Sequence, residues 1–330
     1  MIITRTPFRI SFFGGGTDFP AWYRENGGAV LSTTIDKYCY VSLRKLPPFF
    51  DYKHKTVFFS KQEAFNEIDE IQHPAVRETY RFMDVQDGLV MQHDGDLPSH
   101  SGLGSSSAFT VGLLHALYAL RGKMVSKKRL ALEAIHIEQE MIGEAVGSQD
   151  QMASAFGGLN RINFSAHNSI EVKPFIITAE KSAHLQNSLM LFFTGFARFA
   201  VEIEKDKLQQ LDNNKHVLSL MHSIVDAAAE ILDGPVSKYD DFGALLHESW
   251  LLKKRLSKKV STDAIDDIYA RGMNSGALGG KILGAGGGGF ILFFVRPEDR
   301  ERLRQGLDPL LHVPFRFDAL GSQIIYFTEE

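Results

Sequence analysis

The sequence predicts an α+β protein with mixed sheets. Apolar runs of strand length, such as Leu189–Phe193 and Phe290–Val295, stand among segments of helical periodicity. The clearest helical segment is Val217–Leu232, in which apolar residues recur at alternating steps of three and four. Strands and helices interleave without strict alternation, which favours the α+β class. With 330 residues, 44% of them apolar, the chain can form one large or two ordinary globular domains.

The expected strands follow the apolar runs in chain order. Pro7 interrupts the first run, and the second run shows the alternation of a half-buried strand. The third run is a plausible short strand, and the fourth precedes a glycine–serine loop. The strands are expected at Ile2–Phe13, Tyr38–Leu43, Thr56–Phe59, Gly88–Gln92, Leu159–Phe164, Ile170–Ile177, Leu189–Phe193, Phe290–Val295 and Gln323–Phe327.

The expected helices differ in how much of their surface is apolar. The segment Phe109–Leu120 is apolar nearly all round, so it should be buried at the centre of the fold. Ser126 can cap the helix that follows it, and His73-Pro74 should interrupt the first helix. The helices are expected at Glu63–Met83, Phe109–Leu120, Lys127–Glu144, Val217–Leu232, Asp240–Ser257 and Thr262–Asn274, with a short one starting at Pro297. A boundary near residue 180 divides the chain into domains 1–180 and 181–330.

Charge and cysteine content narrow the classes of function. The net charge of −4 provides no general attraction to nucleic acid or to an anionic membrane. Cys39 is the only cysteine, so an internal disulfide is impossible and a reducing cytoplasm fits. The first residues lack the pattern of a secretion signal, and every apolar run is far shorter than a membrane span. We therefore expect a cytoplasmic protein that binds neither nucleic acid nor membrane.

A glycine–serine loop, Pro98–Ala108, opens the central helix. Gly102 and Gly104 allow the backbone to approach an anion, and the free N–H groups at a helix start attract phosphate. Serine is also a favoured helix cap, so the loop alone does not distinguish phosphate binding from capping. The loop lacks the G-K-[ST] ending of a Walker motif and the third glycine of G-x-G-x-x-G. Any cation that binds phosphate must therefore come from elsewhere in the chain.

A second glycine run, Gly284–Gly289, has Ala285 as its only residue with a side chain. Each glycine costs roughly 0.5–1 kcal/mol relative to alanine in a regular element, so five of them need a reason. A hairpin would need only one or two glycines. Close approach of this backbone to a ligand, or to the first glycine loop, is the better explanation.

Glu138 lies among apolar neighbours at helical spacing. A carboxylate there is costly unless it is paired or binds a metal, although its long stem can equally reach solvent from the rim. Taken singly, Arg9, Asp18 and Asp150 fit a strand end, a helix cap and a loop residue. None of the three would indicate a site without the others.

Three segments together resemble the GHMP kinase superfamily, which includes galactokinase, homoserine kinase and mevalonate kinase. They are R-T-P-F-R-I-S-F-F-G-G-G-T-D at Arg5–Asp18, P-x-x-x-G-L-G-S-S-S-A at Pro98–Ala108, and K-I-L-G-A-G-G-G-G at Lys281–Gly289. The resemblance implies a two-domain fold. The N-terminal domain would resemble domain 2 of ribosomal protein S5, with a left-handed βαβ crossover, and the C-terminal domain would be ferredoxin-like.

The resemblance also implies a role for each matching residue. Asp150 corresponds to the catalytic aspartate that takes the proton of the attacking hydroxyl, and Arg9 to the basic residue that pairs with it. Glu138 corresponds to the magnesium carboxylate, and Ser106 is the serine expected on Mg²⁺. The loop residues expected to bind ATP are Ser101, Gly102, Leu103, Gly104, Ser105, Ser106 and Ser107. Substrate contacts are expected from Gly15, Gly16, Thr17, Asp18, Gly286, Gly287 and Gly288.

The first motif bears on the acceptor. Gly15-Gly16 stand where galactokinases carry Glu-His, which disfavours galactose. The runs 14–23 and 27–38 resemble the bacterial D-glycero-D-manno-heptose 7-phosphate kinases, which phosphorylate the C1 hydroxyl on the way to nucleotide-activated heptose for surface glycans. The distal phosphate of such an acceptor needs a cation, for which Arg198 is the first candidate and Lys37 and Lys173 are weaker ones.

Two other functions stay open. Fucokinase-like sugar 1-kinases with a neutral hexose acceptor are near relatives of the heptose kinase branch. Some members of the superfamily sense sugar and nucleotide without turnover. The joint presence of Arg9, Glu138 and Asp150 argues against a sensor, because a sensor needs no base.

Overall fold

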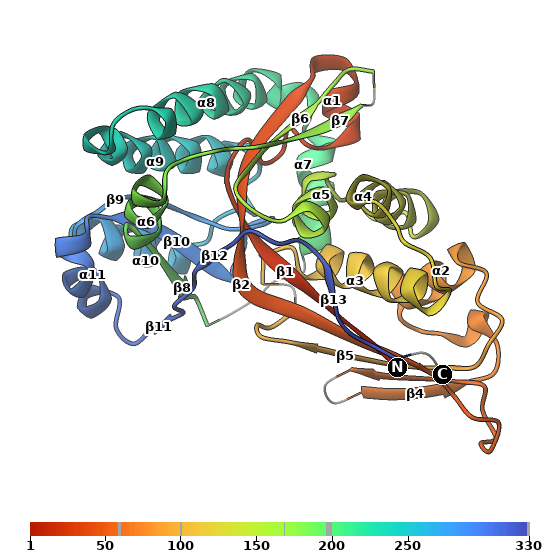
Figure 1. Cartoon of the computed structure of the whole chain (residues 1–330). Helices are drawn as coiled ribbons and strands as arrows, with labels where there is room; N and C mark the ends of the chain where they lie inside the picture. The colour runs from red at the N-terminus through yellow and green to blue at the C-terminus, as the bar shows by residue number, and fades with distance from the viewer. Residues whose placement is uncertain (59–60, 100, 168, 196–199, 329–330) are drawn as a thin grey trace.

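The structure is a computed structural model that describes residues 1–58, 61–99, 101–167, 169–195 and 200–328. Two sheets organise it, and helices pack against both of them (Figure 1). The larger sheet has the strand order β13-β1-β2-β5-β3-β4, with β6, β7 and β12 attached through β2. Its strands are β1 Ile2–Phe13, β2 Gly28–Lys45, β3 His54–Phe58, β4 Lys61–Phe65, β5 Leu89–Gly95, β6 Asn160–Phe164, β7 Ile170–Pro174, β12 Phe317–Asp318 and β13 Gln323–Phe327.

The central helix, α3 (Ser105–Leu120), lies against β1 and β2 as its all-round apolar sequence predicts. Gly112 lets the helix approach closely, since an added Cβ would lie 2.9 Å from Oγ1 of Thr6. The Thr4 hydroxyl donates a hydrogen bond to the Gly112 carbonyl at 3.0 Å. The other helices of this half are α1 Pro20–Asn26, α2 Pro74–Phe82, α4 Lys127–His136 and α5 Gln149–Phe156. The N-cap predicted at Ser126 is confirmed, because its Oγ accepts from the Arg129 N–H.

The smaller sheet is antiparallel, in the order β11-β8-β10-β9. In chain order its strands are β8 Leu189–Phe193, β9 Ala277–Ile282, β10 Phe290–Val295 and β11 Leu311–His312. Helices connect β8 to β9 and β10 to β11, which gives the β-α-β-β-α-β arrangement of a ferredoxin-like unit, as predicted. The helices of this half are α6 Ala179–Asn187, α7 Ala200–Gln209, α8 Lys215–Asp233, α9 Tyr239–Leu256, α10 Asp263–Asn274 and α11 Arg300–Gly306.

The helix expected over Glu63–Met83 is wrong in its first half. Residues Lys61–Phe65 form β4, which pairs antiparallel with β3, and only Pro74–Phe82 is α-helical. The reason is tertiary: Phe65 is buried and its ring stacks on His54 at 5.4 Å between centroids. A single cut at residue 180 also misses one feature, because β12 and β13 return to pair with β2 and β1 (Figure 1). The handedness of the expected crossover stays a prediction.

Within the described ranges, every helix is too short or too polar to span a bilayer.

Candidate active site

The three motifs meet around one cavity of about 170 Å³. The first motif lines the cavity with residues of β1 and of the loop that follows it. The second motif lines it with the start of α3. The third contributes Lys281, Gly284 and Ala285. Side chains from α5, α7 and α9 complete the lining. Segments up to about 280 residues apart in the chain thus face one volume.

The two glycine runs touch each other beside this cavity. A Cβ on Gly284 would lie 2.4 Å from Cα of Gly102, and one on Gly289 would lie 2.4 Å from the Ser101 carbonyl oxygen. Both Gly102 (φ +85°) and Gly284 (φ +66°) have left-handed backbone, which side chains rarely adopt. The prediction that this run approaches the first glycine loop is therefore confirmed.

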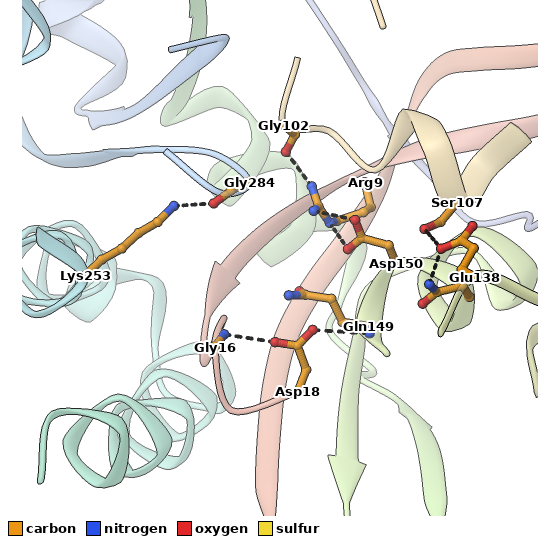
Figure 2. Close-up of polar contacts among 11 residues, drawn as sticks. Arg9, Gly16, Asp18, Gly102, Ser107, Glu138, Gln149, Asp150, Lys253 and Gly284 are labelled. Carbon is orange, nitrogen blue, oxygen red and sulfur yellow. Dashed lines mark hydrogen bonds and ion pairs between the residues drawn. The ribbon is translucent and has the colours of Figure 1, made fainter. Parts of the chain in front are cut away.

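Arg9 and Asp150 form a two-point ion pair in the cavity (Figure 2). Nε of Arg9 lies 2.7 Å from Oδ1 of Asp150, and its NH2 nitrogen lies 2.8 Å from Oδ2. The third guanidinium nitrogen donates to the Gly102 carbonyl at 2.7 Å. Arg9 comes from β1 and Asp150 from the first turn of α5, so the pair connects sheet, helix and glycine loop. The carboxylate side chain is 24% exposed towards the cavity, whereas the arginine is 4% exposed.

Glu138 lies on the far side of the Arg9–Asp150 pair from Lys253, close to the start of α3 (Figure 2). Its Oε2 accepts from Oγ of Ser107 at 2.8 Å and from Nε2 of Gln151 at 2.5 Å. Its Oε1 is buried and has no hydrogen-bond partner among the described residues. Burial raises the pKa of Glu138 to about 7, although the side chains of Thr110, Ser107 and Gln151 oppose part of the rise.

The helix that carries Glu138 widens at this point. The Ile142 N–H donates to the Ile137 carbonyl, five residues back, so Ile137–Met141 is a π-helical turn instead of the continued α-helix that we predicted. Such turns are frequent at functional sites. All three serines that start α3 line the cavity, and of these it is Ser107 that bonds this carboxylate.

Asp18 is held at the edge of the cavity by backbone groups. Its Oδ1 accepts from the Gly16 N–H at 2.9 Å and its Oδ2 from the Gln149 N–H at 3.4 Å (Figure 2). A Cβ on Gly147 would lie 1.8 Å from Oδ2, so only glycine fits there. Burial raises the pKa of Asp18 to about 6, the Gly16 hydrogen bond opposes this, and the nearby Asp150 adds to it.

Three lysines that the sequence interpretation missed also line the cavity: Lys207, Lys253 and Lys281. Lys207 Nζ lies 3.1 Å from Oε1 of Glu204, a further lining residue. No local pattern in the sequence distinguishes these lysines from surface lysines. One signal was available for Lys281, since it stands inside the third motif.

A second cavity of about 400 Å³ adjoins the glycine–serine loop. Ser105 and Ser106 line both cavities. The walls of the second one are mainly ring and apolar side chains, which are Phe8, Phe58, His73, Pro74, His93, Leu97 and Phe109.

The structure brings most predicted site residues to the first cavity, but not all. Those that line it are Arg9, Gly15, Gly16, Asp18, Gly102, Gly104, Ser105, Ser106, Ser107 and Asp150. Glu138, Ser101 and Leu103 are buried outside its lining, and Thr17 holds the loop through hydrogen bonds from its hydroxyl to the carbonyls of Gly14 and Ala29.

Gly286, Gly287 and Gly288 do not line the cavity either. The Gly287 N–H donates to the Val260 carbonyl, so this part of the run packs on protein instead. Arg198 lies outside the described residues. Lys37 and Lys173 pair with Asp36 and Glu171 and do not reach the cavity.

Comparison with known proteins identifies the family of the chain. Residues 70–158 match the GHMP kinases N terminal domain, and residues 226–309 match the GHMP kinases C terminal domain. A D-glycero-alpha-D-manno-heptose 7-phosphate kinase of Campylobacter jejuni is 32% identical over 321 residues, which cover 93% of each chain. The chain belongs to the GHMP kinase family.

Two further similarities agree with this membership. A bifunctional fucokinase/GDP-fucose pyrophosphorylase of Arabidopsis thaliana is 24% identical over 92% of this chain and 30% of that one. A solved structure described as a D-glycero-D-manno-heptose 1-phosphate kinase from Bacteriodes thetaiotaomicron superposes over 100% of both chains, with a TM-score of 0.81 at 21% identity. This GHMP kinase is an ATP-dependent sugar kinase.

Proposed function

We propose that the protein transfers a phosphoryl group from Mg·ATP to the C1 hydroxyl of D-glycero-D-manno-heptose 7-phosphate, giving the 1,7-bisphosphate. This product would lead to nucleotide-activated heptose for surface glycans. The Campylobacter jejuni relative, named for this heptose phosphate, supports the acceptor. The single observation that carries the reaction type is the Arg9–Asp150 pair facing a cavity at the N-terminus of α3.

The two adjoining cavities suggest how ATP binds. The aromatic second cavity suits a flat purine ring, since ligand pockets are lined mainly by apolar and ring side chains. The triphosphate would pass over Ser105 and Ser106, which line both cavities. There the free N–H groups at the start of α3, a helix of 16 residues, attract the phosphates. The terminal phosphate then points towards Arg9 and Asp150.

Glu138 and the serines at the start of α3 fit a magnesium ion. Mg²⁺ prefers carboxylate and hydroxyl oxygens and is usually held by one or two carboxylates together with substrate phosphates. Oε1 of Glu138 is a buried acceptor without a partner among the described residues, as expected of a metal ligand. Ser106 and Glu138 are therefore the proposed ligands. When bound, the ion would neutralise charge on the nucleotide phosphates.

Asp150 and Arg9 provide the remaining chemistry. The exposed edge of the Asp150 carboxylate can accept a hydrogen bond from the attacking hydroxyl and then its proton. Because Arg9 binds both oxygens of this carboxylate, it holds the carboxylate in one orientation. A carboxylate is a weak base at neutral pH, so in this proposal Asp150 orients the hydroxyl more than it deprotonates it. Such positioning is the main requirement of phosphoryl transfer.

The sugar hydroxyls have a polar wall to bind. Oγ of Ser11 and Oε1 of Gln149 are buried, line the cavity and have no partners among the described residues. Asp18 adds a carboxylate beside them. Unpaired polar atoms are costly unless a ligand satisfies them, which supports a polyhydroxylated acceptor. Gly15 carries no side chain that would narrow this part of the cavity.

The test is ADP release with Mg·ATP across a panel of heptose 7-phosphate, mannose, fucose, galactose and no sugar. We expect turnover on heptose 7-phosphate, and a kcat about 100 to 10,000 times lower in Asp150→Asn. The KM for ATP in the mutant should stay within a few-fold of the wild-type value. Turnover on a neutral hexose alone would replace the acceptor and favour a fucokinase-like enzyme. Equal activity in the mutant would contradict the role of Asp150.

A further inference from the structure

Three lysines line the cavity beside the third motif, a part of the lining that we call the lysine end: Lys207 of α7 and Lys253 of α9, which bond carbonyls of residues 282–285, and Lys281 of β9. Lys253 and Lys281 are 6% and 3% exposed. Lys253 Nζ donates to the carbonyls of Ile282 and Gly284 at 2.7 and 2.6 Å. Lys281 Nζ donates to the Phe12 carbonyl at 2.7 Å, and Lys207 Nζ to the Ala285 carbonyl at 2.7 Å. Two buried ammonium groups are thus held by neutral oxygens.

Charge balance leaves this end of the cavity positive. Among its described lining residues, the acidic ones are Asp18, Asp150 and Glu204. Asp150 is paired with Arg9, and Glu204 with Lys207. Within the described part of the chain, Lys253 and Lys281 therefore have no carboxylate partner, and Asp18 bonds backbone N–H groups. A phosphate monoester carries close to two negative charges at neutral pH, which matches the two unpaired lysines.

Holding these lysines together without an anion is energetically unfavourable. Burial, followed by the charges of Arg9 and Lys207, lowers the pKa of Lys281 to about 7. Burial, followed by the charges of Lys207 and Lys281, also lowers the pKa of Lys253. A purely structural link between segments could use a neutral donor and avoid this cost. A bound anion would remove the mutual repulsion, as buried charges require.

The position of the lysines bears on which phosphate they bind, that of the nucleotide or that of the acceptor. In Figure 2, Lys253 and the Ser107–Glu138 pair lie on opposite sides of Arg9 and Asp150. The Ser107–Glu138 side is the start of α3, where we place the nucleotide phosphates. Lys253 is therefore across the Arg9–Asp150 pair from the nucleotide phosphates as we place them, on the side where the remote part of the acceptor would lie.

We propose that Lys253 and Lys281, supported by Lys207, bind the phosphate that the acceptor already carries, at the end remote from the reacting hydroxyl. This assignment rests on the proposed function and replaces Lys37 and Lys173, which do not reach the cavity. It makes these lysines the group that selects a sugar phosphate over a neutral sugar.

The test compares kcat/KM for D-glycero-D-manno-heptose 7-phosphate and for the same heptose without phosphate, at saturating Mg·ATP. We expect the wild type to prefer the phosphorylated sugar by about 100-fold or more, since charge-assisted hydrogen bonds are strong. Lys253→Met and Lys281→Met should each reduce this preference at least about tenfold, mainly through the acceptor KM. Lys254→Met is the matched control on the same helix: its Nζ bonds Asp266, and the preference should be unchanged.

The kinetic comparison can overturn the lysine site. An equal loss with both sugars would mean that the lysines only hold the structure. A raised KM for ATP with an unchanged acceptor KM would mean that they bind the nucleotide phosphate instead.

Calorimetry on the wild type tests the lysine site without any variant, so it stays informative if a variant misfolds. Heptose 7-phosphate, titrated at about pH 7.5 in two buffers of different ionisation enthalpy, should bind with uptake of up to about one proton. Uptake is expected because a bound anion raises the lowered lysine pKa values, and the unphosphorylated heptose should show none. Binding of the phosphate ester without proton uptake would count against the site.

Failure of the proposed function gives a different pattern. A wild type that phosphorylates only a neutral hexose would discard the sugar phosphate acceptor, and the lysine site with it. A wild type that phosphorylates heptose 7-phosphate, with the full preference kept in both methionine variants, would discard only the lysine site.

Discussion

Asp18 shows how much a single residue depends on its backbone surroundings. Its side chain is 1% exposed, and its two hydrogen bonds come from backbone N–H groups of Gly16 and Gln149. The absence of a side chain at Gly147 makes room for the carboxylate. A group buried in this way favours its protonated form, so its charge costs stability in the ligand-free protein. We interpret this cost as the consequence of keeping an acceptor for sugar hydroxyls in the cavity.

The first prediction concerns Asp18→Asn. The folded-state pKa of Asp18, about 6, lies above the ordinary value of 3.8, so the folded protein holds a proton that the unfolded chain has lost between these values. The free energy of unfolding should therefore fall as pH rises through this window, by about 1–3 kcal/mol from this group. Asp18→Asn removes that loss. Relative to wild type, its Tm should be higher at about pH 7.5 and nearly equal at about pH 4.

The control for this prediction is Asp267→Asn, at an exposed position of α10. It should leave the pH profile of Tm unchanged. A lower Tm in Asp18→Asn at neutral pH would show that the ionised carboxylate stabilises the fold. In Asp18→Asn the KM for the acceptor should rise, since a sugar hydroxyl loses a charged partner.

At the scale of elements, two glycine-rich loops and one helix start form the cradle of the site. The backbones of the two loops pack directly against each other, so closely that an added Cβ at the contact would clash. Lys253 from α9 also donates to the carbonyls of Ile282 and Gly284 in the third motif. The position of the helix start relative to Asp150 therefore depends on a contact between loops about 180 residues apart.

The second prediction follows from this contact. In Gly284→Ala the added Cβ would lie 2.4 Å from Cα of Gly102, so the two loops must separate. We expect kcat to fall about 100-fold, because a shift of about 1 Å in positioning has effects of that size. Gly122→Ala is the matched control: Gly122 has a similar φ, +63°, but nothing lies within 4 Å of an added Cβ. Steady-state kinetics and urea unfolding of both variants separate lost positioning from backbone strain, and equal kcat values would refute the contact's role.

At the scale of the whole molecule, the first strand and the last strand lie side by side. The Met1 amino group donates to the Thr328 carbonyl at 3.0 Å, and β13 pairs with β1 (Figure 1). The strand β1 also carries Arg9, and its Phe12 carbonyl accepts from Lys281 of the smaller sheet. The two sheets are thus connected at the cavity itself.

The third prediction is that the order of the chain can be changed without loss of the site. A circular permutant joins the old ends by a short Gly/Ser linker and opens the chain between Gly122 and Lys123, both exposed. Its kcat/KM should stay within about threefold of wild type, because termini that lie close together tolerate such joining. Opening between Gly286 and Gly287, which are buried beside Val260, should abolish activity. A folded but inactive first permutant would contradict the prediction.

Local signals accounted for much of the fold and of the site. Periodicity predicted most helices and strands, since burial of one face repeats along the chain. The motif resemblance predicted the family and, by position, the pairing of Arg9 with Asp150, which the structure contains. Local backbone conformation explains why glycine stands at Gly102 and Gly284, because that conformation excludes other residues. These features depend on residue type and near neighbours, which the sequence states directly.

The sequence by itself determined the fold class, the family and, through the motif resemblance, the pairing of Arg9 with Asp150. Tertiary structure alone decided that Lys61–Phe65 is a strand, since its partner β3 fixes it, and that Gly287 packs on Val260 instead of lining the cavity. It also decided that Lys207, Lys253 and Lys281 share one end of the cavity. A lysine at the surface and a lysine in a site look alike in a sequence. What separates them is burial and charge supplied by segments far along the chain.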